Sequence, residues 1–267
     1  MYTIQSYKKV DSLEEAYALN QKKSTTIIGG GMWLRLGSRP IGTAIDLSGL
    51  GLNQIEETED SFNIGCMTTL REIESHQGLN RYFHEMPAEM MRSIVGIQFR
   101  NTATIGGSIY QRFGFSDPLT GFLALNTEVE MYGAGRISLE DFVNMKYDRD
   151  ILVALHVKKD GCRAAYESFR NTKTDFPVVT VAVSRKEDHW KAVIGARPGR
   201  ARVAEKDYIM DERPSEEAIK KFAVQSRDNV HFGSNMRAGA EYRSLLAEVL
   251  IKRAVKTIVN QPERQNG

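Results

Sequence analysis

The chain has 267 residues, of which 41% are hydrophobic and 26% are charged, as in a globular protein with a sizeable core. Its 36 basic and 34 acidic residues give a net charge of +2 without blocks of like charge, so a nucleic acid is not an expected partner. The sequence has no run of about 18 apolar residues, and its first residues lack the pattern of a secretory signal. We therefore expect a cytoplasmic protein that does not enter the membrane.

Cysteine and histidine usage does not indicate a metal centre. Cys66 and Cys162 are the only cysteines, whereas an iron–sulfur cluster normally needs four thiolates and a structural zinc ion needs as many ligands. The histidines are scattered without metal-ligand spacing, at His76, His84, His156, His189 and His231. We expect no metal in this chain and interpret both cysteines as buried thiols.

The first hundred residues predict short helices alternating with short strands. Ser12 to Glu15 and Thr69 to Glu72 have the form of a capping box, so a helix is expected to begin at each. β-Branched and alternating runs predict strands at 25–28, 44–47 and 62–65. A longer helix is expected over residues 87–95, with Pro87 in its first turn.

Two glycine-rich turns lie about 75 residues apart, one after the strand at 25–28 and one after the helix expected at 87–95. The first glycine turn, residues 27–34, continues the strand at 25–28 and contains three consecutive glycines; the second glycine turn, residues 104–108, reads Thr-Ile-Gly-Gly-Ser. Glycine permits positive φ and leaves no Cβ between the backbone and a ligand, and consecutive amides can form an anion-binding concavity. Two such turns in one fold predict a site for the two phosphates of a dinucleotide.

Neither turn matches the phosphate-binding patterns of better-known nucleotide-binding folds. Leu34 stands where the third glycine of G-x-G-x-x-G belongs, and no lysine followed by serine or threonine completes a P-loop, so a Rossmann dehydrogenase or a P-loop ATPase is disfavoured. A strand-to-loop bend that needs glycine for steric reasons is the alternative for either turn. The second turn supports the prediction of a phosphate site more strongly than the first, because the hydroxyls of Thr104 and Ser108 flank its glycines.

The rest of the chain predicts a second, smaller domain. A helix is expected to begin at Asp117-Pro118, and a charged turn at 158–161 closes a strand at 151–157. After that turn, three consecutive strands and two helices are expected. We therefore predict an α+β protein with domains at 1–160 and 161–267, the second built from a three-stranded antiparallel sheet plus helices.

Several stretches together resemble the FAD-binding, medium-subunit family of the molybdenum hydroxylases, such as the flavin subunits of bacterial xanthine dehydrogenase and carbon monoxide dehydrogenase. The most specific stretch is 100–108 with Asp117 downstream. The other matching stretches are the first glycine turn, 45–48, 64–70, 119–125, 137–142, 240–243 and Arg253. The resemblance covers nearly the whole chain and implies a two-part FAD-binding domain of the p-cresol methylhydroxylase type, followed by the family's C-terminal domain.

The resemblance also implies a cofactor site without catalytic side chains. The first turn would wrap the pyrophosphate of a non-covalently bound FAD, and the second would hold its other side. Asp117 would accept hydrogen bonds from flavin-side hydroxyls or cap its helix, and Leu152 would pack near the isoalloxazine ring or belong to the ordinary core. The implied cofactor-binding residues are Ile27, Ile28, Gly29, Gly30, Gly31, Met32, Trp33, Leu34, Thr104, Ile105, Gly106, Gly107, Ser108, Asp117 and Leu152.

Two departures from the family pattern bear on this site. Met32 and Trp33 stand where relatives usually have a small hydroxyl residue and a polar one, and the loss of one hydroxyl contact removes about 0.5–1.5 kcal/mol. The lysine or arginine that many relatives place near the flavin has no clear counterpart. Arg170 or Lys173 could replace it, although each is a surface charge by default.

The implied function is that of one subunit in a redox complex. A partner with a molybdenum cofactor would oxidise the substrate, and electrons would cross [2Fe–2S] clusters in a second partner, reach the FAD and leave to NAD⁺ or another acceptor. Two partner chains are implied, since this chain cannot hold the clusters. The alternatives are a free-standing flavin oxidoreductase and a non-redox assembly subunit with a weakened FAD site.

Overall fold

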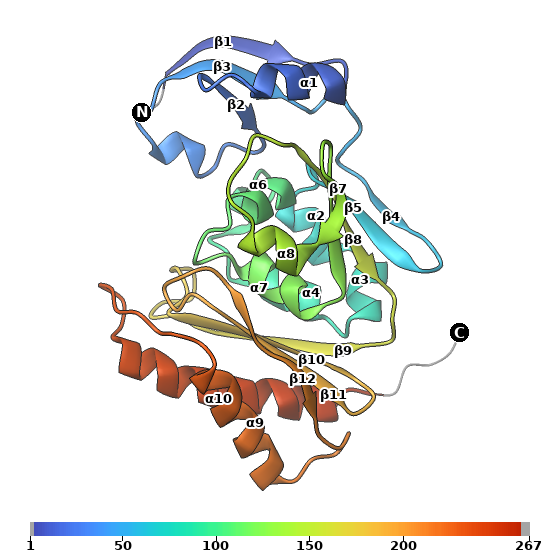
Figure 1. Ribbon diagram of the computed structural model, residues 1–267, viewed down its shortest axis with the longest axis vertical. Coiled ribbons are helices and arrows are strands. Elements are labelled where there is room, and N and C mark those ends of the chain that lie inside the picture. The colour runs from blue at the N-terminus through green and yellow to red at the C-terminus, as the bar shows by residue number, and fades with distance from the viewer. Residues whose placement is uncertain (1–2, 263–267) are drawn as a thin grey trace.

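The computed structural model describes residues 3–262 and stacks three β-sheets along the long axis of the molecule (Figure 1). The small first sheet lies at one end, a five-stranded sheet with most of the short helices lies in the middle, and a four-stranded sheet with two long helices lies at the other end. The predicted α+β class is confirmed. Within residues 3–262, no helix has both the length and the apolar character needed to cross a bilayer.

The first sheet is parallel, in the order β1-β3-β2. It comprises β1 (Ile4–Lys9), β2 (Thr25–Ile28) and β3 (Ile41–Asp46), with α1 (Leu13–Asn20) between the first two strands and the short 3₁₀ helix η1 (Leu34–Leu36) after β2. Ser12 caps α1 by accepting a hydrogen bond from the amide of Glu15. The first glycine turn therefore leaves the carboxyl end of β2, as predicted.

The middle sheet is antiparallel, in the order β4-β5-β8-β6-β7. Its strands are β4 (Ile55–Glu57), β5 (Ser61–Gly65), β6 (Thr127–Met131), β7 (Gly135–Ser138) and β8 (Leu152–Lys158). Its helices are α2 (Leu70–Ser75), α3 (Gln77–Tyr82), α4 (Met86–Arg92), α5 (Ile97–Arg100), α6 (Ile105–Tyr110), α7 (Asp117–Ala124) and α8 (Leu139–Asn144). The second glycine turn is thus the first turn of α6, capped by Thr104.

The predicted helix over 87–95 is too long. α4 ends at Arg92, and Val95 has a φ of 50°, a left-handed conformation that a β-branched residue rarely adopts. A new short helix, α5, begins at Ile97. The chain therefore turns sharply just before it reaches the second glycine turn.

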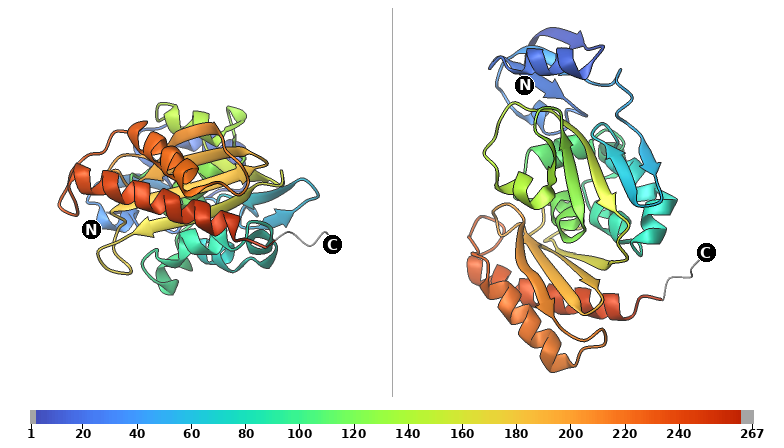
Figure 2. Two further views of the ribbon diagram at one scale, coloured as in Figure 1. Left: turned by 90° about the horizontal axis from the view of Figure 1, so that it is seen from below. Right: turned by 45° about the vertical axis from the view of Figure 1, so that its right-hand side comes forward.

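The C-terminal sheet has four antiparallel strands, in the order β12-β11-β10-β9, so the prediction of three strands missed one. The strands are β9 (Arg163–Phe169), β10 (Val179–Lys186), β11 (His189–Gly195) and β12 (Arg202–Ile209). β12 is an edge strand with only Ala204 fully buried, so it lacks the apolar alternation that predicts a strand. The helices α9 (Glu216–Asp228) and α10 (Ala240–Val259) cover one face, and α7 packs on the other (Figures 1 and 2).

Candidate functional site

The two glycine turns lie in direct contact. A Cβ on Gly29 would overlap the side-chain oxygen of Thr104, and one on Gly30 would overlap the carbonyl oxygen of Thr102. The glycines of the first turn therefore allow the backbone of residues 29–30 to pack against residues 102–104. Glycine is therefore sterically required in the first turn because the second turn packs directly against it.

The backbone amides of the first turn that follow β2 are free to bind a ligand. Those of residues 29–33 donate no hydrogen bond to any acceptor within residues 3–262. Gly31 has a φ of 67°, which turns the chain into η1 and curves this run of donors. Unpaired amides that converge in a turn attract an anion such as a phosphate.

The second turn has fewer free donors than its sequence indicates. The amide of Ile105 donates to the carbonyl of Thr68 at 2.9 Å, and that of Gly106 donates to the carbonyl of Cys66 at 2.8 Å. The amide of Gly107 makes only a long 3.3 Å bond to the side chain of Thr104. Of these three amides, that of Gly107 is therefore the one a ligand can most easily recruit.

Gly106 and Gly107 are glycines for different reasons. A Cβ on Gly106 would lie 2.6 Å from the carbonyl oxygen of Cys66, so glycine is required here for α6 to pack against the residue that follows β5. A Cβ on Gly107 would meet only the side-chain oxygen of Thr104, at 3.4 Å, which is an ordinary contact. No protein atom excludes a side chain at Gly107, which instead borders a cavity.

This polar cavity lies between the first sheet and the middle sheet. Six of the predicted residues line it: Ile27, Gly29, Thr104, Gly106, Gly107 and Leu152. Cys66 also lines the cavity, and burial raises the pKa of its thiol to about 12, so it is not a thiolate at neutral pH. A non-covalent ligand fits this environment.

Two further residues of the polar cavity escaped the sequence-based prediction. Arg149 donates from Nη2 to the carbonyl of Thr25 at 2.8 Å and from Nε to the carbonyl of Asn20, so it fastens the first sheet to the loop before β8. Tyr110 donates to the carbonyl of Asp148 at 2.8 Å, and burial raises the pKa of its phenol to about 12. Arg149 lies 45 positions after Thr104, and its position in a charged run before β8 was the only signal in the sequence.

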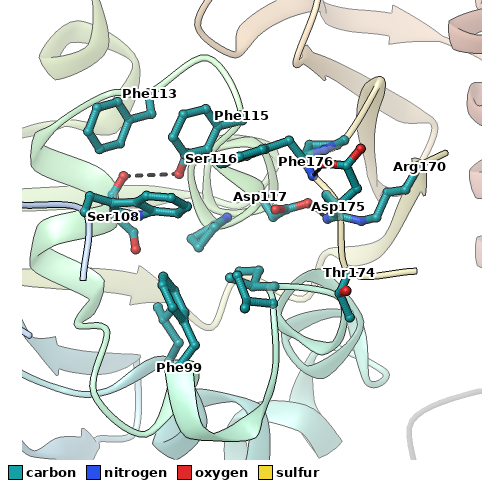
Figure 3. A pocket seen from close by; sticks show the side chains of 16 residues that line it. Phe99, Ser108, Phe113, Phe115, Ser116, Asp117, Arg170, Thr174, Asp175 and Phe176 are labelled. Carbon is teal, nitrogen blue, oxygen red and sulfur yellow. Dashed lines mark hydrogen bonds and ion pairs between the residues drawn. The ribbon is translucent and has the colours of Figure 1, made fainter. Parts of the chain in front are cut away.

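On the other side of the turns lies a second space, the aromatic hollow (Figure 3). Three predicted residues line it: Trp33, Ser108 and Asp117. Its other walls include Phe99, Phe113, Phe115 and Phe176, the last of which belongs to the loop between β9 and β10. The hollow therefore forms where the middle part of the molecule meets the C-terminal sheet.

Asp117 is held by two residues of the C-terminal part. Its Oδ1 accepts hydrogen bonds from the hydroxyl of Tyr166 and from Nη2 of Arg170. Burial raises the pKa of Asp117, and the guanidinium of Arg170 opposes that rise. Asp117 is not the N-cap of α7: Ser116 is, with its side chain accepting from the amide of Leu119.

Arg170 is not the surface charge expected by default. Its side chain is only 6% exposed, and it lies beside the hollow with its Nε buried and without a hydrogen-bond acceptor among the described residues. Arg170 also lines the hollow, so a guanidinium group stands in this wall beside the carboxylate of Asp117.

The other predicted residues do not line either space. Ile105 is fully buried in the core. Gly30, Gly31 and Met32 line a shallow groove with Arg35. Ile28 ends β2, and Leu34 begins η1. Each glycine turn thus contributes residues to both the polar cavity and the aromatic hollow and lies between them.

Comparison with protein families identifies both parts of the chain. Residues 2–157 match the family described as the FAD-binding domain in molybdopterin dehydrogenase. Residues 164–258 match the C-terminal domain of CO dehydrogenase flavoproteins.

Individual relatives are similar over nearly their full length. The chain is 25% identical to the glyceraldehyde dehydrogenase medium chain of Sulfolobus acidocaldarius, covering 95% of this chain and 98% of the relative. It is 26% identical to the nicotine 6-hydroxylase medium subunit of Paenarthrobacter nicotinovorans, covering 93% and 95%. A chain in the structure of reconstituted CO dehydrogenase from Oligotropha carboxidovorans has the same fold, with a TM-score of 0.83 at 20% identity over 98% of this chain and 99% of that chain.

Proposed function

The chain belongs to the family of FAD-binding subunits of molybdopterin dehydrogenases, and we propose that it holds one FAD across its two glycine turns and passes electrons through it. The observation that supports this layout is the position of the turns between the polar cavity and the aromatic hollow. FAD has its diphosphate in the middle and a planar group at each end. A ligand of that shape can place phosphates at the turns and one ring system in each space.

In this layout the free amides of residues 29–33 bind the phosphates, with the amide of Gly107 opposite them. The aromatic hollow takes the isoalloxazine ring, because its walls are aromatic and one of them carries the guanidinium of Arg170. The polar cavity then takes the adenosine. Leu152 lines the polar cavity, so we assign it to the adenosine half and no longer to the isoalloxazine ring.

Bound FAD supplies the redox chemistry, taking up and releasing electrons one or two at a time. The residues of this chain position it, shield it from water and set the charge around it. We assign no catalytic acid, base or nucleophile. We propose residues 1–160 as the FAD-binding domain and 161–267 as the C-terminal domain.

The partners follow from the same proposal. The curated relatives are a medium chain and a medium subunit of larger enzymes. We propose that an iron–sulfur subunit delivers electrons from a molybdenum-cofactor subunit, that NAD⁺ is the final acceptor, and that the complex works in the cytoplasm. Co-purification tests this: both partner chains should accompany the tagged protein, and NADH should bleach its yellow colour. A chain that purifies alone and oxidises NADH by itself would favour a free-standing flavin oxidoreductase.

FAD binding is tested most sharply at Gly107. A Gly107→Ala variant is expected to bind FAD at least about tenfold more weakly, because the new methyl group projects toward the space that the phosphates would occupy. Its free energy of unfolding should stay within about 1 kcal/mol of the wild-type value, since alanine is tolerated in a helix and meets no clash.

The measurements are a titration of the FAD-free chain with FAD and a urea unfolding curve. Gly239→Ala is the matched control, because Gly239 is followed directly by a helix, α10, and a Cβ there meets nothing within 4 Å. It should leave FAD affinity unchanged. Wild-type protein that takes up no flavin would contradict the proposal and favour an assembly subunit.

A further inference from the structure

Trp33 lies at the centre of an aromatic cluster that lines the hollow, because its ring contacts all four phenylalanine rings of that cluster. Its ring centroid is 5.1 Å from that of Phe115, 5.3 Å from that of Phe99 and 5.3 Å from that of Phe176. Phe113 stacks on Phe115 at 4.9 Å, with the ring planes 10° apart. These rings come from four segments: the first glycine turn, α5, the loop after α6 and the loop after β9.

The cluster keeps part of its apolar surface accessible. Phe99 is buried, whereas Trp33, Phe113, Phe115 and Phe176 are only partly buried. Partly exposed aromatic rings around one hollow form a surface that a planar ring can cover, and aromatic pairs gain about 0.5–1.5 kcal/mol beyond the area they bury. Trp33 is also the one member that belongs to a phosphate-binding turn, so it links the proposed phosphate site to the hollow.

The polar groups of the hollow indicate what kind of ring fits it. The guanidinium of Arg170 lines it, with Nη2 donating to Asp117 and Nη1 donating to the backbone carbonyl of Asp175. Asp117 lies beside it as the one carboxylate paired with that guanidinium. A flat heteroaromatic ring with a carbonyl or ring nitrogen on one edge would place that edge toward the guanidinium while its face covers the aromatic side chains.

We propose that the indole of Trp33 is the side chain against which the isoalloxazine ring of FAD packs. This inference rests on the proposed function and adds a ring-contacting residue to it. The indole thus compensates, through ring contact, for the polar group that the first turn lacks at this position. Trp33 acts on the affinity and on the orientation of the ring, and takes no part in proton transfer.

Contact of this kind has a spectroscopic signature. An indole in van der Waals contact with a bound isoalloxazine ring would quench its fluorescence reversibly, because indole is a good electron donor to a light-excited flavin. Phenylalanine cannot give up that electron but keeps a ring in place. Trp33→Phe is therefore expected to restore the fluorescence of bound FAD and to weaken its binding about two- to tenfold.

Trp190 provides the matched control. It is the only other tryptophan, is fully buried in the separate core between the C-terminal sheet and its helices, and donates from its indole nitrogen to the carbonyl of Met210 at 2.9 Å. Trp190→Phe should leave the fluorescence of bound FAD as low as in the wild type. The bound fraction is measured independently by visible absorbance after gel filtration, and the emission lifetime is recorded on that fraction.

Three results would overturn the inference while FAD binding itself stands. Bound FAD that is fluorescent in the wild type, or that in Trp33→Phe stays non-fluorescent and keeps its wild-type affinity, would show that the indole does not touch the ring. FAD uptake that improves in Trp33→Ala would show that Trp33 obstructs the hollow. A wild-type chain and three variants that all bind no FAD would instead overturn the proposed function, and this inference with it.

Discussion

A Gly30→Ala variant is expected to lose FAD binding by about 100-fold or more and to unfold about 2–3 kcal/mol more easily than the wild type. The added Cβ would overlap the carbonyl oxygen of Thr102 and lie 3.0 Å from the amide nitrogen of Ala103. Because both obstacles are backbone atoms, no rotamer change relieves them. The two glycine turns must separate, which breaks the site between the polar cavity and the aromatic hollow.

The measurements are again FAD titration and urea unfolding, and Gly29 supplies the contrast. A Cβ on Gly29 would overlap only the side chain of Thr104. Gly29→Ala should therefore be damaging alone and largely tolerated together with Thr104→Ala, apart from the loss of the Thr104 cap on α6, which costs about 1 kcal/mol. No such rescue exists for Gly30. A Gly30→Ala chain with wild-type affinity would show that the turns need not touch.

The general layout of the site could be predicted from the sequence, but it could not be predicted which turn supplies the free backbone amides. The hydroxyls of Thr104 and Ser108 favoured the second turn as the main phosphate site. In the folded chain the amides of Ile105 and Gly106 are occupied by carbonyls of residues 66 and 68, almost 40 positions earlier. A local pattern does not show such long-range hydrogen bonds, and the free donors lie in the first turn instead.

Long-range pairing also explains why Asp117 does not cap its helix and why Arg170 is not a surface charge. The sequence Asp117-Pro118 predicts a helix start, with Asp117 as the possible cap. A tertiary contact prevents Asp117 from capping the helix, since its carboxylate forms a buried ion pair with Arg170, 53 positions later. The arginine itself looked exposed because the residues around it are polar. Family likeness, in contrast, correctly predicted the FAD-binding domain and the C-terminal domain of the family, although not the fourth strand of the C-terminal sheet, because it depends on many weak matches along the chain.

The Arg170→Met variant is expected to lower the free energy of unfolding of the FAD-free chain at neutral pH by about 3–5 kcal/mol. Methionine fills much of the same space but leaves the carboxylate of Asp117 buried with only the hydroxyl of Tyr166 as a side-chain partner. Removing one member of a buried ion pair costs more than the pair itself contributes, because the remaining charge is neither solvated nor neutralised.

The loss should depend on pH with a defined sign. Burial already raises the pKa of Asp117, and without the guanidinium the pKa rises further above its value in the unfolded chain. A carboxyl with a raised folded-state pKa contributes its stability fully below the unfolded-state pKa and loses it as the pH rises through the folded-state pKa. The deficit of Arg170→Met relative to the wild type should therefore be small in acid and grow toward neutral pH.

Urea unfolding at about pH 5 and about pH 8 measures this difference. The control is the double variant Asp117→Asn/Arg170→Met, which carries no buried charge at this position and should regain most of the lost stability at the higher pH. A deficit equal at both pH values, or a double variant as unstable as Arg170→Met, would show that the arginine acts through packing alone. The expected pattern would instead establish that Arg170 is retained to neutralise Asp117, so the same cation is already in place at the edge of the hollow where the proposed ring would bind.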